Sequence, residues 1–185
     1  MKKLLLLLIT ICGLFISCES TDVEDKKYIP DGFEQYSDNS DIYVKNDVLS
    51  GYKLYIHNNL VNEYRPAMIQ IGVNDSASYL VLTLQYKGEE WIFFNSSVFA
   101  NANGERLSLK VNTLNKKEDM NSKYVYESVL MPLNNEDAKS LLNILNCNDV
   151  YMRFGGKHTK DYTLDAEYIR GLKEILEFYF DNFSK

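Results

Sequence analysis

Residues 79–94 read YLVLTLQYKGEEWIFF, and they carry the strongest strand pattern in the chain. The first eight alternate with a period of two, which is the repeat of a strand with distinct faces. This places three leucines together on one face: Leu80, Leu82 and Leu84. We expect residues 87–90 to form a turn and residues 91–94 to return as a second strand. The pair should lie at the centre of an antiparallel sheet, with Trp91 in the core.

Shorter strands are predicted on both sides of this pair: 42–44, 52–56 and 67–73 before it, and 106–111 and 124–131 after it. The dipeptide Asn103-Gly104 is the strongest hairpin signal, and the polar residues 112–122 are expected to form a loop. Glu127 falls among the apolar positions of the last strand. We interpret it as a charge on an edge strand that guards against aggregation, with an inward-facing functional carboxylate as the alternative.

After residue 133 the pattern changes to that of helices. Asn134 and Asp165 are suited to cap two helices, because their side-chain oxygens accept hydrogen bonds from the first free backbone N–H groups. A hairpin around Gly155-Gly156 separates the two helices. Each helix has one apolar stripe, formed by Ala138, Leu141, Leu142 and Leu145 in the first and by Ile169, Leu172, Ile175, Leu176, Tyr179 and Phe183 in the second. The predicted fold is therefore α+β: an antiparallel sheet of about six to nine strands with two C-terminal helices packed on it.

The N-terminus has the order of a secretory signal. Lys2 and Lys3 precede an apolar run that ends at Ile16, and this run is too short to remain as a membrane-spanning helix. The small residue Ser17 stands directly before Cys18. This arrangement resembles the lipobox of bacterial lipoproteins, in which the signal is cleaved before the cysteine and that cysteine carries the lipid. The resemblance implies cleavage between Ser17 and Cys18 and a palmitate-type anchor on Cys18.

Three segments follow from this interpretation: a signal peptide at 1–17, the lipidated cysteine with an acidic tether at 18–32, and a single α+β domain at 33–185. Phe15 departs from the leucine that the family prefers, and an ordinary secretory signal or an uncleaved signal anchor is the alternative. We interpret the acidic tether as a solvated linker, with a resemblance to the surface-export signals of some Bacteroidota lipoproteins as the alternative. The expected location is the bacterial cell envelope, lipid-anchored to a membrane, with the outer membrane or cell surface favoured over the inner membrane.

The composition is that of a folded, acidic protein. Hydrophobic residues make up 45% of the chain, which is enough for a packed core. The formal charge is −6 and becomes −8 once Lys2 and Lys3 leave with the signal. Nucleic acid is excluded as a partner, because its phosphates require clusters of lysine and arginine. With Cys12 in the signal and Cys18 lipidated, Cys147 stands alone, so the domain has to fold without an internal disulfide.

No enzyme motif is recognisable in the sequence, and we expect neither enzymatic activity nor a bound cofactor or metal. His57 and His158 could form a zinc site with Cys147, but the three lack the short ligand spacing of such sites, and both histidines are expected to be exposed. Glu89 and Glu90 are adjacent, so they point to opposite sides and cannot act together on one bond. Residues 38–41 offer oxygen ligands but lack the glycine and the glutamate of a calcium loop.

The predicted function is that of a non-enzymatic envelope lipoprotein that binds a protein partner. The alternative is a carbohydrate-binding surface lipoprotein that uses exposed aromatic residues, either Trp91 or tyrosines on the strands. Core packing is expected to explain most of the fourteen tyrosines. The candidates for a binding role are Tyr43, Tyr52, Tyr55, Tyr124, Tyr126 and Tyr151.

Overall fold

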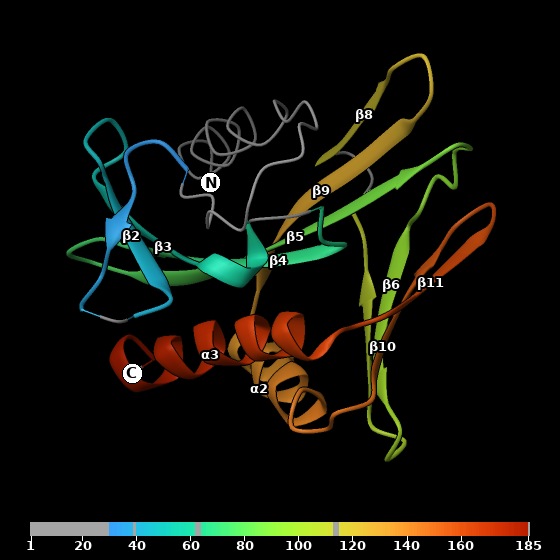
Figure 1. Ribbon diagram of the computed structural model, residues 1–185. Coiled ribbons are helices and arrows are strands. Elements are labelled where there is room, and N and C mark those ends of the chain that lie inside the picture. The colour runs from blue at the N-terminus through green and yellow to red at the C-terminus, as the bar shows by residue number, and fades with distance from the viewer. Residues whose placement is uncertain (1–29, 39, 62–63, 113–114, 185) are drawn as a thin grey trace.

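The computed structural model describes residues 30–38, 40–61, 64–112 and 115–184, and Figure 1 shows their arrangement. These residues form eleven strands, two α-helices and one 3-10 turn (η1, Asn58–Leu60). The strands make two antiparallel sheets, and both helices lie on the same side of the larger sheet (Figure 1). The predicted α+β fold, with an antiparallel sheet and helices packed on it, is confirmed.

The larger sheet has seven strands in the order β1-β2-β3-β4-β5-β9-β8. The strongest strand of the sequence pattern, β5, lies in its interior, where Leu84 pairs with Ala67 of β4 on one side and with Val129 of β9 on the other. The three leucines of β5 are at most 1% exposed. The strand bounds are Glu34–Gln35 (β1), Ile42–Asp47 (β2), Tyr52–His57 (β3), Ala67–Val73 (β4), Ser78–Gly88 (β5), Lys116–Met120 (β8) and Val125–Leu133 (β9).

The smaller sheet has four strands in the order β11-β10-β6-β7. Their bounds are Ser96–Asn101 (β6), Arg106–Lys110 (β7), Val150–Gly155 (β10) and Thr159–Thr163 (β11). One face of this sheet is apolar and belongs to the core, as the buried Phe99, Met152 and Phe154 show. The alternate positions of the same strands point away from the core, because successive side chains on a strand point to opposite faces.

The two helices fill the space between the sheets. Helix α2 (Asn135–Ile144) packs on β6 and β7, and helix α3 (Ala166–Asn182) packs on β3, β4 and η1 (Figure 1). Both caps follow the prediction, since the Asn134 side chain accepts a hydrogen bond from the backbone N–H of Asp137 and the Asp165 side chain accepts one from that of Tyr168. The apolar stripes of both helices join one core with the two sheets.

Residues 91–94 are not a strand, so this part of the prediction is wrong. The chain leaves the seven-stranded sheet after β5 and crosses to the four-stranded sheet, which it enters at β6. Ile92 and Phe94 are buried in the core, but Phe93 has a φ of 49°, a value that breaks a strand. Residues 91–94, which we call the crossing segment, are apolar because most of them pack against the core and not because they pair with β5.

Two further strands differ from the sequence interpretation. Strand β8 forms within the predicted loop 112–122, where its polar residues Lys116–Met120 pair with β9 at the edge of the larger sheet. A strand made almost entirely of charged residues carries no apolar alternation, so periodicity does not reveal it. No strand is assigned to residues 96–101 in the sequence either, although the hairpin signal Asn103-Gly104 marks the turn that joins strand β6 to β7.

Candidate functional site

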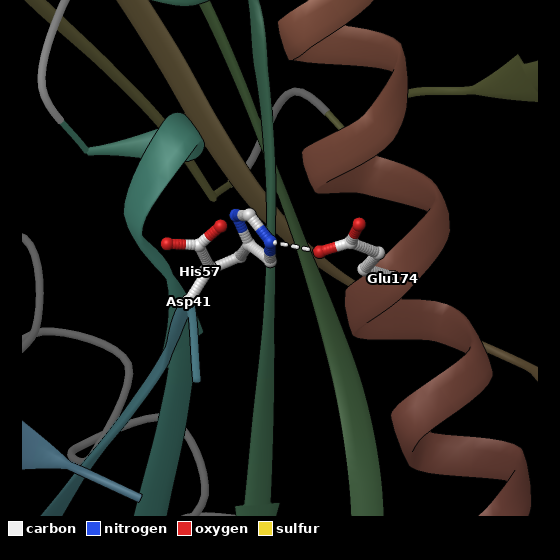
Figure 2. A group of neighbouring side chains, drawn as sticks. All are labelled: Asp41, His57 and Glu174. Carbon is white, nitrogen blue, oxygen red and sulfur yellow. Dashed lines mark hydrogen bonds and ion pairs between the residues drawn. The ribbon is translucent and has the colours of Figure 1, made fainter. Parts of the chain in front are cut away.

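Figure 2 shows the first candidate site, in which His57 lies between Asp41 and Glu174. The three come from separate elements: Asp41 directly precedes β2, His57 ends β3, and Glu174 lies on α3. Their ligand atoms all lie within 4.8 Å of one another. The histidine is fully buried, whereas the side chains of Asp41 and Glu174 are 24% and 41% exposed. The predicted exposure of His57 is therefore wrong.

The hydrogen bonds of His57 assign its proton. The backbone N–H of Asn59 donates to Nδ1 at 3.1 Å, so the proton of the neutral ring is on Nε2. Nε2 lies 2.8 Å from Oε2 of Glu174 and donates to it. Neither ring nitrogen is left to accept a proton from a substrate. A metal on Nε2 would require the proton to move to Nδ1, where the N–H of Asn59 already points. The group therefore suits neither general-base catalysis nor metal binding.

The hydrogen bond between His57 and Glu174 instead joins α3 to the end of β3. Gly171 allows this close approach, since a Cβ there would stand 3.0 Å from the side chain of Asn59 and 3.1 Å from Nδ1 of His57. The hydrogen bond to Glu174 also offsets the free-energy cost of burying the polar ring of His57. We conclude that the group in Figure 2 serves the fold.

Acid should destabilise the fold through His57. Burial lowers the pKa of His57 below its ordinary value, and this outweighs the opposing effect of Glu174. The unfolded chain therefore binds the proton more readily than the folded chain, and stability is lost as the pH falls below about 6.5. We expect the free energy of unfolding, measured with urea, to drop less between pH 7 and pH 5 in His57→Gln than in the wild type. His158→Gln, a change at an exposed histidine, should keep the wild-type drop, and an equal drop in all three proteins would contradict this assignment.

The second candidate is Glu127, which is fully buried in β9. Its carboxylate accepts three consecutive backbone N–H groups, from Ile92 and Phe93 at 2.8 Å each and from Phe94 at 3.0 Å. Lys116 of β8, whose side chain is 5% exposed, donates to the same carboxylate at 2.7 Å. The buried charge is thus neutralised, and the donors of the crossing segment are satisfied without a neighbouring strand.

The prediction that Glu127 guards a sheet edge is wrong. Strand β9 lies between β5 and β8, and Glu127 faces the core opposite Tyr86. The alternative, an inward-facing carboxylate, describes its position. Both oxygens of the carboxylate accept hydrogen bonds, from the crossing segment and from Lys116. The role of Glu127 is therefore to hold that segment in place.

Trp91 and Phe93 lie on this fixed segment. Their rings stack at a centroid distance of 5.7 Å with an interplanar angle of 15°. Trp91 packs against the core that it was predicted to join, but it is only partly buried. Phe93 is 45% exposed, and Lys116 lies 5.4 Å from its ring centre. The ring of Phe94 lies 5.2 Å from the same ammonium group, so Phe93 and Phe94 both pack against the cation that pairs with Glu127.

The third candidate is an open hollow of about 350 Å³ on the outer face of the four-stranded sheet. The strand register explains it. Ala100 in β6 pairs with Arg106 of β7 on one side and with Tyr151 of β10 on the other. Val98, two residues earlier in β6, pairs with Arg153. Ala100 therefore lies between two long side chains and Val98 lies beside a third, and this difference in side-chain length makes the hollow.

The walls of the hollow are polar and aromatic. Tyr151 is 46% exposed, which makes it the exposed member of the six candidate tyrosines. Arg153 donates to both carboxylate oxygens of Asp161 at 2.5 and 2.6 Å. This bond holds the pKa of Asp161 below its ordinary value, so the pair is ionic at neutral pH. Arg106 stands on the opposite side and donates to Ser108. Periodicity alone could not find this site, because it depends on the register of four strands.

The remaining sequence candidates are dispersed. Glu89, Glu90 and His158 are exposed, and Cys147 is a half-buried free thiol. Within the part of the chain that the structure describes, the potential metal ligands gathered around His57 are Asp41 and Glu174 rather than Cys147 and His158. Of residues 38–41, position 39 lies outside the described residues, as do Ser17 and Cys18.

Comparisons with protein-family models, with curated proteins and with solved structures find no match to this chain. Among the described residues, no helix has both the length and the apolar character needed to cross a membrane.

Proposed function

We propose that this protein is a non-enzymatic binding protein of the bacterial envelope, held to a membrane by a lipid on Cys18. The observation that carries the proposal is the N-terminal order of two lysines, a short apolar run and Ser17-Cys18. A multiply acylated cysteine gives stable attachment, whereas a single chain binds only marginally. The outer membrane or the cell surface is the location that we favour, on the acidic composition of residues 19–25.

The structure supports a binding role through the hollow on the four-stranded sheet. Its exposed Tyr151 and its two arginines belong to the residue types that dominate binding energies at interfaces. His57 and Glu127, which are fully buried, have their polar atoms engaged by backbone N–H groups and by the side chains of Glu174 and Lys116. Both support the fold, so we place the binding role on the hollow.

A sedimentation experiment tests this role. The full-length lipidated protein, purified in detergent, is mixed with delipidated envelope fragments and centrifuged, and the supernatant is analysed for released saccharides and peptides. We expect the wild type to sediment with the fragments, Tyr151→Ala to remain largely in the supernatant, and no product to accumulate with time. Failure of the wild type to sediment, or a steady release of products, would contradict a non-enzymatic binding role.

A further inference from the structure

We propose that the hollow on the four-stranded sheet binds an acidic saccharide, with one sugar ring on Tyr151 and a uronate carboxylate on Arg106. The inference rests on the proposed binding function and names the ligand class of that same surface. Of the sequence alternatives, it selects carbohydrate over a protein partner.

The charge of the hollow favours an anionic ligand. The residues that line the hollow carry two guanidinium groups, those of Arg106 and Arg153, and one carboxylate, that of Asp161. The hollow is therefore net positive in a chain whose formal charge is −6. A guanidinium binds a carboxylate through two parallel hydrogen bonds, and the contact between Arg153 and Asp161 already shows this geometry inside the hollow. Arg106 offers the same chemistry to a carboxylate from outside.

The shape and the aromatic content favour a sugar over a peptide. A pyranose ring has an apolar C–H face and a rim of hydroxyl groups, and the electron-rich face of an aromatic ring attracts such C–H groups. Tyr151 supplies an exposed ring beside the polar groups of Arg153, Asp161 and Thr163. The centre of a protein interface is usually depleted of charged residues and covers about 800 Å² on each partner. A small hollow with charged walls and a single exposed aromatic residue is a poor match to that description.

The spacing of the two main groups fits linked sugar rings. Arg106 and Tyr151 lie in the same cross-strand row, separated by Ala100. Two strand spacings place their backbones about 10 Å apart, a distance that two joined pyranose rings span. One ring can stack on Tyr151 while the carboxylate of the next reaches Arg106.

Calorimetric titration of the full-length protein in detergent tests the proposal. The ligands are a hexamer of galacturonic acid, the same hexamer with its carboxylates methyl-esterified, and hexaglutamate as an acidic peptide. We expect the acid hexamer to bind, the ester to bind more weakly and hexaglutamate to bind least. Added salt should weaken binding of the acid more than that of the ester.

Three variants assign the contacts. Tyr151→Ala should lower the affinity for both hexamers about tenfold, the upper range of one aromatic contact. Arg106→Gln should remove the preference for acid over ester and leave ester binding intact. Tyr36→Ala is the matched control, because Tyr36 is also 46% exposed but lies outside the hollow, and it should change neither affinity.

Equal binding of acid and ester, stronger binding of hexaglutamate, or an unchanged affinity in Tyr151→Ala would overturn the proposal. The absence of binding to either hexamer would overturn it as well. If the wild type still sediments with envelope fragments in that case, the ligand class is wrong and the binding role stands.

Discussion

Replacing Glu127 by alanine should destabilise the protein by about 3–5 kcal/mol, the range found when one partner of a buried ion pair is removed. The change leaves three backbone N–H groups at residues 92–94 without their acceptor, and it leaves the buried Lys116 without its closest anion. Such a loss is a large part of the 5–15 kcal/mol that holds a typical domain together. The measurement is urea unfolding followed by circular dichroism.

Glu118 provides the matched control. Its carboxylate also contacts Lys116, at 3.1 Å, but its side chain is 44% exposed. Glu118→Ala should therefore cost no more than about 1 kcal/mol, as expected for an exposed ion pair. Glu127→Gln, which keeps the size and one acceptor oxygen but loses the charge, should fall between the two alanine variants. If Glu127→Ala were no less stable than Glu118→Ala, the carboxylate would not be holding the crossing segment.

Removing the Phe94 ring should cost about 3–5 kcal/mol, because Phe94→Ala opens a cavity in the core. Phe94 is 0% exposed, and its ring centre lies 4.6 Å from that of Phe154 in the second sheet. The neighbouring Phe93 should behave differently. Its side chain is 45% exposed, and its φ of 49° is a conformation that glycine adopts without strain.

We therefore expect Phe93→Gly to change the free energy of unfolding by no more than about 1 kcal/mol, as surface substitutions do. Urea titrations of the two variants, run beside the wild type, compare adjacent positions of the same segment. A loss of equal size in both would show that residues 91–94 do not follow the described path.

The sequence predicted the elements whose signals are local. The three leucines that alternate in β5 join the core shared with both helices, and the caps at Asn134 and Asp165 depend on backbone N–H groups within three residues. In contrast, the path of residues 91–94 depends on Glu127, which follows more than thirty residues later. An apolar run is compatible with a strand and with a buried crossing, and periodicity does not separate the two.

The candidate sites also combine features that are local in the sequence with features that depend on long-range contacts. Tyr151 was among the candidates, since an aromatic residue on a strand is visible in the sequence. Its partners in the hollow were not, because Arg106 and Tyr151 are brought together by strand β6, which the sequence did not reveal. His57 was expected to be exposed, and its burial follows from contact with α3, more than a hundred residues away.

Fatty-acid labelling at Cys18 is the most direct test of the envelope assignment. Cells that express the full-length wild type, Cys18→Ser or Cys147→Ser are grown with an alkyne-tagged palmitate analogue, and the label on the purified protein is measured. Cys147 is the matched control, because it is the other cysteine that remains beyond the predicted cleavage site. We predict label on the wild type and on Cys147→Ser and none on Cys18→Ser. Undiminished label on Cys18→Ser would contradict a lipid anchor at this residue.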